Sequence, residues 1–469
     1  MEQNGVPTVG FISKTFEHDF QASAKVFGVP SLPYVIVAER ALPTMGPEEI
    51  GRRVEGVVDQ VIDRLTTFSP MPAEAASREE LVNLGTTLFG LEVPETEVFE
   101  GADQLEAWSK MNVTYLERGW GDGFPLVPAT PELVGAMLTG TRRSPEETVA
   151  VLEPCFGIAT VEKLAINAVM AGCKPEHLPV LIAAVEAISD PLYELRHVAM
   201  STSPYTPMLV INGPIVQRIG LNSGMACLGP GAPSAVNTVI GRALRLILMN
   251  VSGNYVGVTD MDTLGDPNKY SMCLAEREEE NPWEPLHVER GYRGDQSTVT
   301  AFVANTNITH ADHYTTEPVP FLRRLAGVVC NPGVTATGWW MGRPQKDINP
   351  MDLKPEHYDH DCLIILCPNH ARMLALQGWV KPGVKEALHL FAKMPIREGP
   401  GLVGTALLRY RDDNNKVRNE WGWLAGYPDL EVPAYRSPDS YQIIVAGADS
   451  QKSMVVLGGK KLITRLIEE

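Results

Sequence analysis

The stretch CLIILCPNHARMLALQGW, residues 362–379, indicates the fold class of this chain more clearly than the segments around it. Its first five residues are apolar, and two of them are β-branched, which is typical of a short strand buried on both faces. The residues that follow have the composition of a helix. A buried strand that leads directly into a helix predicts one βα unit of an α/β protein.

The same alternation continues on both sides of this unit. The segment FLRRLAGVVC (321–330) precedes it, and a helix, GVKEALHLFAKM (383–394), follows it. Two more apolar runs, YQIIVAG (441–447) and SMVVLGG (453–459), read as strands near the end of the chain. The chain from about residue 318 onward therefore predicts a βαβ-type region.

The N-terminal segment predicts a second, shorter α/β unit. Strand-like PTVGFIS (7–13) and PYVIVAE (33–39) flank a helical stretch at 18–28. A further helix over 46–65 has an apolar stripe at helical spacing, formed by Ile50, Val54, Val57, Val58, Ile62 and Leu65. Two strands make a marginal open sheet, so we expect an incomplete doubly wound unit.

These patterns give an α/β, multi-domain chain, which agrees with a length of 469 residues. We expect a partial α/β domain at 1–70, a connector rich in Pro, Glu and Ser at 71–100, a central mixed α+β region at 101–300, and a C-terminal α/β domain at 301–469. No internal repeat is evident in the sequence.

Composition and charge exclude several classes of protein. A net charge of −17 disfavours nucleic acid and anionic membrane surfaces as partners. The seven cysteines are scattered without a CxxC pair, so neither a disulfide framework nor a structural zinc site is indicated. The sequence shows neither a signal peptide nor an apolar run long enough to span a membrane. We therefore expect a cytoplasmic protein with reduced thiols.

The segment GVPTVGFISKTF…GVPSLPYVIVAERALPTMGPEEI, at residues 5–50, resembles the second half of the UGSC family, proteins named for a U/C-G-S-C motif with selenocysteine or cysteine. Two later stretches, at 367–388 and 443–459, resemble the large region that accompanies it in some bacterial proteins. The resemblance puts the motif ahead of about residue 5, and no residue of this sequence matches it. It implies a partner subunit that carries the upstream half of the domain, with self-association as the competing solution.

The first candidate reactive group is Cys173, at a junction between two predicted helices. A cysteine ahead of the turn that begins at Pro175, and beside Lys174, is expected to have a depressed pKa. The alternative is a small residue that fills a helix–helix corner. Lys163 and Asn167 lie four residues apart on the preceding helix and can face one ligand, or else form a solvated face.

The second candidate is a glycine-rich loop that feeds a long apolar helix. Gly229 and Gly231 permit close approach of a ligand, and Ser234 is placed to cap the helix. Arg242 and Arg245 follow on that helix and can clamp a carboxylate, unless they pair with acids of the chain itself. The loop is neither a Walker loop nor a dinucleotide fingerprint, so the cofactor stays unknown. Asp122, in a Gly-Asp-Gly turn, is a further candidate at a pocket mouth, or a plain turn residue.

Histidines supply the remaining candidates. His370 follows the buried strand of the opening stretch, the edge at which open α/β sheets place ligands, and is either a general acid or base or a helix N-terminal residue. Loops rich in His and Asp supply candidate metal ligands, His310, His313, His357 and His360, unless these residues serve only the turns of the loops.

Together these features predict a subunit of a bacterial enzyme that acts on a small anionic or carbonyl-containing molecule. The glycine loop and the arginines would hold the anion, and Lys163, Asn167 and Cys173 would line the reacting end. By resemblance, a partner thiol or selenol implies reductive or lyase-type chemistry. The alternatives are a metal-dependent hydratase or hydrolase that uses the His/Asp loops, and a noncatalytic binding subunit.

Overall fold

The structure is a computed structural model and describes residues 7–14, 17, 20, 21, 24, 32–38, 47–67, 96–330, 360–398, 427–458 and 460–468. Its described helices and strands form several sheets with helices against them, so the expected α/β fold of several regions is confirmed. Along these described segments, no helix combines the length and the apolar character that crossing a bilayer requires.

The N-terminal unit has the predicted pattern. β1 (Gly10–Ser13) and β2 (Tyr34–Ala38) pair in parallel, and α2 (Pro47–Glu55) and α3 (Val58–Thr66) follow. Val57 and Val61 pack on Val35 and Val37 of β2, whereas Val54, Val58 and Ile62 of the predicted apolar stripe are exposed. Most of the helix expected at 18–28 lies outside the described residues.

The central region starts with helices whose first turns are capped by side chains. Asp103, Thr130 and Thr160 accept the backbone N–H groups that begin α5 (Gln104–Glu117), α6 (Pro131–Leu138) and α7 (Val161–Ala171). A hairpin of β3 (Thr148–Leu152) and β4 (Gly157–Thr160) precedes α7. The helices α8 (Leu178–Ile188) and α9 (Leu195–Ala199) then lead into the first sheet.

Two four-stranded mixed sheets form the body of the protein. The first sheet has the order β14-β7-β5-β6, with β5 (Thr206–Asn212), β6 (Cys273–Ala275), β7 (Thr298–Ala304) and β14 (Ile463–Leu466). The second has the order β12-β9-β13-β8, with β8 (Thr306–Ala311), β9 (Cys362–Leu366), β12 (Tyr441–Val445) and β13 (Lys452–Leu457). The strands predicted at 362–366, 441–447 and 453–459 are therefore confirmed.

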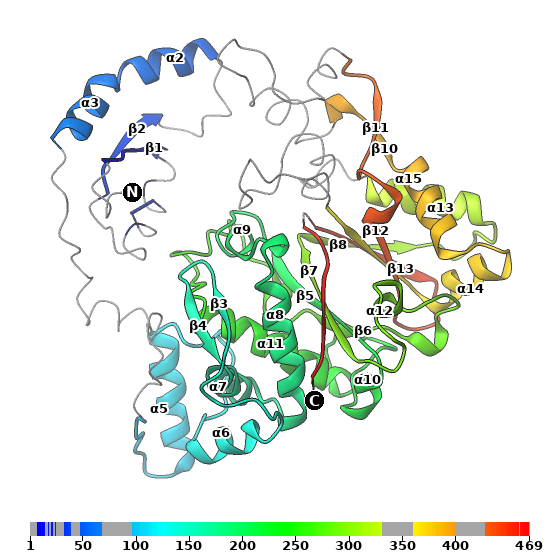
Figure 1. The fold of residues 1–469 in the computed structure, drawn as a ribbon, viewed down its shortest axis with the longest axis horizontal. Coiled ribbons are helices and arrows are strands. Elements are labelled where there is room, and N and C mark those ends of the chain that lie inside the picture. Colours follow the sequence, from blue (N-terminus) through cyan, green and yellow to red (C-terminus); the bar gives the residue numbers. More distant parts are fainter. Residues whose placement is uncertain are drawn as a thin grey trace.

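The two sheets pack face to face between two layers of helices (Figure 1). Alternate residues of each strand point to opposite faces. Met208 and Val210 of β5 thus meet Ile365 of β9 in an apolar layer between the sheets. The other face of the first sheet is covered by α7, α8 and α11 (Ala235–Asn250). The outer face of the second is covered by α13 (Pro318–Val329), α14 (Pro368–Leu376) and α15 (Lys381–Phe391).

The two sheets share one connectivity and exchange one strand each. In both, a parallel pair (β5–β6 or β9–β12) is followed by an antiparallel strand (β7 or β13) on the free side of the first strand. The chain then crosses over, because β8 follows β7 but joins the second sheet, and β14 follows β13 but joins the first. Residues 300 and 301, between which a domain boundary was expected, both lie in β7, and no sequence repeat indicates this shared topology.

The segment that links β7 to β8 and the segment that links β13 to β14 lie against each other. The N–H of Asn305, between β7 and β8, donates to the carbonyl of Leu457 over 2.8 Å. A Cβ at Gly458, on the other link, would lie 1.9 Å from the carbonyl oxygen of Val303. The crossing therefore requires glycine at position 458.

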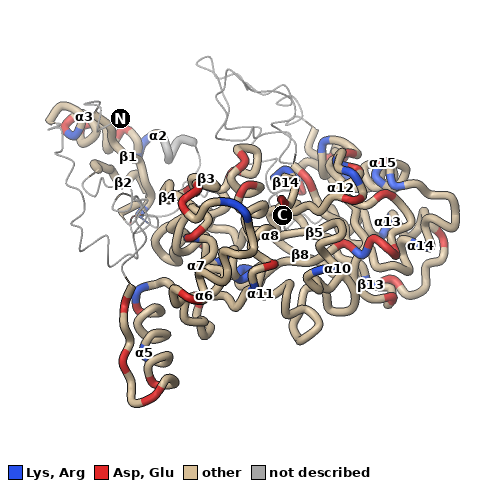
Figure 2. Tube along the Cα trace, turned by 60° about the horizontal axis from the view of Figure 1, so that its bottom comes forward, with Lys and Arg blue, Asp and Glu red and all other residues tan. Residues whose placement is uncertain are grey.

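Short elements complete the described fold. They are α10 (Ile215–Arg218), α12 (Leu286–Glu289) and the strand pair β10 (Lys393–Pro395) and β11 (Glu431–Pro433). Figure 2 shows basic and acidic residues interspersed along α12 to α15.

Candidate functional site

Two of the predicted binding residues, Arg242 and Asp122, bind each other. The Arg242 Nε and Nη2 atoms lie 2.7 and 2.9 Å from the two oxygens of Asp122. The guanidinium also donates to the carbonyls of Phe124 and Pro125. This bidentate pair holds the Gly-Asp-Gly turn against α11, which is the self-pairing alternative raised by the sequence.

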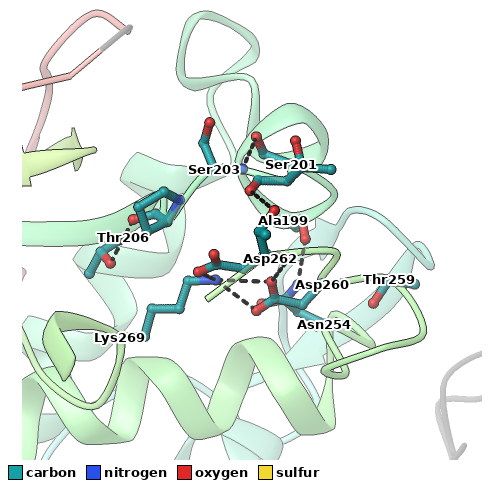
Figure 3. A network of polar contacts seen from close by, with 12 residues as sticks. Ala199, Ser201, Ser203, Thr206, Asn254, Thr259, Asp260, Asp262 and Lys269 are labelled. Carbon is teal, nitrogen blue, oxygen red and sulfur yellow. Dashed lines mark hydrogen bonds and ion pairs between the residues drawn. The ribbon is translucent and has the colours of Figure 1, made fainter. Parts of the chain in front are cut away.

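Arg245 lies one turn further along α11, in a cluster of four charges. Its guanidinium donates to Asn254 over 2.5 Å and to Asp260 over 3.3 Å. Lys269 reaches Asp260 over 2.9 Å and Asp262 over 2.8 Å (Figure 3). Burial outweighs the nearby carboxylates and lowers the pKa of Arg245. The cluster holds two positive and two negative groups, and its charges balance.

A small cavity adjoins this cluster at the start of β5. Apolar side chains of α9 and α11 form one wall, and Arg245, Asp260 and Lys269 lie on the other. Its volume is about 20 Å³, which is room for about one water molecule. A balanced cluster beside a water-sized cavity is a structural arrangement that needs no ligand to neutralise it.

Replacing Arg245 with alanine is therefore expected to lower the free energy of unfolding by about 2–3 kcal/mol, because buried hydrogen bonds between charged groups are lost. Urea unfolding measures the change. Arg293→Ala, in an ion pair whose side chains are 71% and 72% exposed, is the matched control and should cost under about 1 kcal/mol. Unchanged stability with a selective loss of ligand binding would instead make Arg245 a binding residue.

The glycine-rich loop uses its polar groups internally. Gly229 and Gly231 have φ of 83° and 121°, which only glycine adopts readily. Ser234 directly precedes α11, but its hydroxyl donates to the carbonyl of Ala226 over 2.6 Å and does not cap the helix. The expected serine cap is therefore wrong. Arg245 lies roughly 16 Å further along α11, at 1.5 Å per residue, so the loop and this arginine do not form one anion site.

Cys173 is a packed thiol, and its expected depressed pKa is wrong. Burial raises the pKa of Cys173 far above its usual value, and the thiol contacts the carbonyl of Val239 at 3.3 Å. The 3-10 turn Pro175–His177 that follows Lys174 runs directly into α8, so the expected helix end is present, but burial outweighs its effect on the thiol. The positive charge of Arg242 favours the thiolate, but burial outweighs it.

Lys163 and Asn167 are buried, with exposed fractions of 6% and 3%, so the alternative of a solvated face is wrong. Lys163 donates to the carbonyl of Ile158 over 3.1 Å, and burial lowers its pKa. Asn167 donates to the carbonyl of Lys163 and accepts from Asn250 over 2.7 Å. The amide in the helix interior thus has the partners that its position needs.

The predicted metal ligands that the structure describes do not form a metal site. Within the segments that the structure describes, no group of three or more His, Cys, Asp or Glu side chains could hold a metal ion. His310 is buried at the end of β8, whereas His313 contacts Gln451 in a loop. His360 is buried just before β9, and His357 lies outside the described residues.

His370 was predicted as a site residue, and the structure places it in a cluster whose other members were not predicted. β9 is buried along its whole length, and its carboxyl end leads into α14, where Cys367 is the N-cap residue. His370, in the first turn, is 3% exposed, and Cys367 is 1% exposed. Both therefore lie where an open α/β sheet places ligands and where the helix dipole favours negative charge.

Ser453, at the start of β13, connects the two side chains. Its Oγ lies 2.7 Å from His370 Nδ1, accepts the N–H of Cys367 over 3.1 Å, and lies 3.8 Å from the Cys367 sulfur. On its other side, His370 Nε2 lies 3.0 Å from the carbonyl oxygen of Asp312. A carbonyl only accepts, so Nε2 carries hydrogen and Nδ1 is the nitrogen that exchanges a proton with the thiol side.

This arrangement favours a thiolate and an imidazolium. Burial opposes the charge of Cys367, but the hydrogen bond and positive charge of His370 outweigh it and lower the pKa of the thiol. Burial likewise opposes the charge of His370, and the contacts with Cys367 and Asp312 raise its pKa. All seven cysteines lie in described segments, and burial raises the pKa of the other six.

Cys367 was missed in the sequence as a functional residue. The available signal was its spacing from His370, three residues apart across the end of a buried strand. Ser453 and Asp312 carried no such signal, because they lie 83 and 58 residues from His370 along the chain.

Comparison with known proteins concerns the N-terminal unit. Residues 1–67 match the model of the UGSC family, so the resemblance expected from this segment is confirmed. Neither a curated protein nor a solved structure gives a significant match. The matched segment contains β1, β2, α2 and α3, and Cys367 and His370 lie outside it.

Proposed function

We propose that this chain is an enzyme subunit that acts on a small anionic or carbonyl-containing molecule, with Cys367 as nucleophile and His370 as acid and base. The observation that carries the proposal is the hydrogen-bonded Cys367–Ser453–His370 cluster, in which the geometry leaves Nδ1 of His370 facing the thiol. A nucleophile with an adjacent base, oriented in turn by a third group, is the general pattern of covalent catalysis.

The chemistry begins with addition to a carbonyl. The thiolate of Cys367 forms a bond to the carbonyl carbon as the C=O π bond breaks, and the oxygen takes the proton held by His370 Nδ1. Atoms and charges balance without another reactant, and the product is a covalent hemithioacetal. The N-terminus of α14 and the imidazolium both favour a substrate that carries negative charge.

Later steps depend on what the adduct carries. Loss of a group next to the bound carbon would be lyase-type chemistry. A reductive outcome would need a second thiol or selenol, and the UGSC resemblance of the N-terminal unit supports a partner subunit as its source. The seven free cysteines support a reducing compartment, for which the cytoplasm is our proposal.

The surface of the N-terminal unit supports a partner. Val54, Val58 and Ile62 repeat every four residues along α2 and α3, with exposed fractions of 40%, 41% and 53%. An exposed apolar stripe favours a second protein, which we take to be a subunit with the UGSC motif, over self-association. Size-exclusion chromatography after co-expression with a neighbouring gene product tests this; a monodisperse monomer with full turnover contradicts it.

The thiol proposal is tested by alkylation across pH. With iodoacetamide and peptide mapping, the modification rate of Cys367 should rise with pH around an apparent pKa below about 8.5, because its lowered pKa provides thiolate where ordinary thiols are protonated. Cys173 and Cys330 are internal controls, since burial raises the pKa of both. If Cys367 titrates at about 8.5 or above, the cluster is structural and a noncatalytic role gains support.

A further inference from the structure

Asp312, just after β8, is held by contacts from three directions. Its Oδ1 accepts the N–H groups of Tyr314 and Thr315 over 3.3 and 3.0 Å. Its Oδ2 lies 3.0 Å from Arg324 Nη1 of α13. Its own N–H donates to the carbonyl of Gln451 over 3.2 Å. These contacts fix both the side chain and the peptide plane of Asp312.

We propose that Asp312, clamped by Arg324, is the positioning residue that sets the ring orientation and proton arrangement of His370. The inference rests on the proposed function, because it concerns how the same Cys367–His370 pair is prepared for reaction. Asp312 touches His370 through its main-chain carbonyl, while its carboxylate faces the turn and Arg324.

The first effect is on the proton arrangement of the ring. Because the carbonyl oxygen of Asp312 takes the N–H of Nε2, the neutral imidazole must present a bare Nδ1 to Ser453 and Cys367. If the carbonyl moved away, both forms of the neutral ring would become accessible. A ring protonated on Nδ1 could not accept the proton of the thiol.

The second effect is on charge. Although burial works in the opposite direction, hydrogen bonds from Thr315, Arg324 and Tyr314 lower the pKa of Asp312 to about 2, so its carboxylate stays negative at any working pH. The other ionisable groups around His370 are Cys367 at its own helix end, His310 on β8 and Arg324 on α13. Burial and the charge of His370 lower the pKa of His310, so Asp312 and the thiolate supply the negative charge that favours the imidazolium.

Three variants separate orientation from charge. Asp312→Asn keeps an amide oxygen for the turn N–H groups but removes the charge. Asp312→Ala removes both. Arg324→Gln loosens the clamp at a side chain that is 59% exposed, so the fold should tolerate it. Asp449→Asn, in an exposed pair with Arg372 of α14, the helix that carries His370, is the matched control.

Two measurements on the full-length chain test the proposal. The alkylation profile should show a rise of about one unit in the apparent pKa of Cys367 in Asp312→Ala, which is about a tenfold fall in thiolate at neutral pH. Smaller rises are expected in Asp312→Asn and Arg324→Gln, and none in Asp449→Asn. In ¹⁵N-histidine NMR, neutral His370 should carry hydrogen on Nε2 in the wild type and in Asp312→Asn, and a mixture should appear in Asp312→Ala.

The outcomes distinguish a failure of the proposed function from a failure of the role proposed for Asp312. A wild-type apparent pKa of about 8.5 or higher overturns the proposed function and removes what Asp312 would prepare. A lowered wild-type value that is unchanged in all three variants leaves the thiol enzyme standing and overturns the role of Asp312. Hydrogen on Nδ1 of neutral wild-type His370 overturns it independently. If Asp312→Ala does not fold, Arg324→Gln and Asp312→Asn decide the question.

Discussion

Cys367→Ala is expected to reduce turnover by at least about 10³-fold, because it removes the nucleophile and leaves His370 without a group to activate. The substrate panel consists of small aldehydes and 2-oxo acids, which combine the carbonyl and the negative charge that the site favours. Intact-mass spectrometry of the wild type under non-denaturing conditions, with an excess of the same compounds, should detect an adduct at Cys367. Loss of both the turnover and the adduct in Cys367→Ala would show that turnover depends on the Cys367 sulfur.

The matched control is Cys330→Ala. Cys330 packs against the apolar core between the second sheet and its helices, and burial raises its pKa to about 12. This variant should retain activity within a few-fold of the wild type and should form the same adduct. His370→Asn should fall between the two, since the thiol remains but loses its base. Turnover in Cys367→Ala within tenfold of the wild type would refute the assignment of the nucleophile.

Lys460→Met is expected to lower the free energy of unfolding by about 3–5 kcal/mol, the usual cost of leaving one partner of a buried ion pair without the other. Lys460 lies on the link from β13 to β14 and pairs with Glu194, ahead of α9. Their side chains are 3% and 1% exposed, so water cannot replace the lost partner. Urea unfolding measures the effect.

The pair also tests the strand exchange, because it joins the link into β14 to the helical layer of the first sheet. Glu194→Gln combined with Lys460→Met should cost less than the sum of the two single changes, since the uncompensated charge is gone. Arg293→Met, at an exposed pair, should cost under about 1 kcal/mol. A Lys460→Met protein as stable as the Arg293 variant would mean that the link contributes nothing to the fold.

The secondary structure could be predicted where its cause is local. The buried strand at 362–366, the helices around it and the strands near the end of the chain follow from apolar periodicity, and all are present. The N-terminal strands likewise follow from their apolar runs, and their parallel pairing agrees with a βαβ unit. Gly172 ends α7 in the left-handed conformation, which favours glycine at the end of a helix.

The site could be predicted in part for the same reason. His370 was found because the end of a buried strand is recognisable in the sequence. Cys173 was misjudged because its neighbours along the chain indicated a depressed pKa, whereas burial in the tertiary structure raises it. Arg242 and Asp122 were both chosen as ligand residues, but their real partners are each other, 120 residues apart.

The sequence by itself determined which segments become strands and helices, because apolar spacing, caps and glycines act within a few residues. Only the tertiary structure decided that β8 and β14 exchange between sheets, since pairing depends on which edges meet in space. Only it brought Ser453 and the carbonyl of Asp312 to His370, across 83 and 58 residues. Whether a thiol is charged depends on the dipoles and charges within a few ångströms, and these come from strands that are distant in the chain.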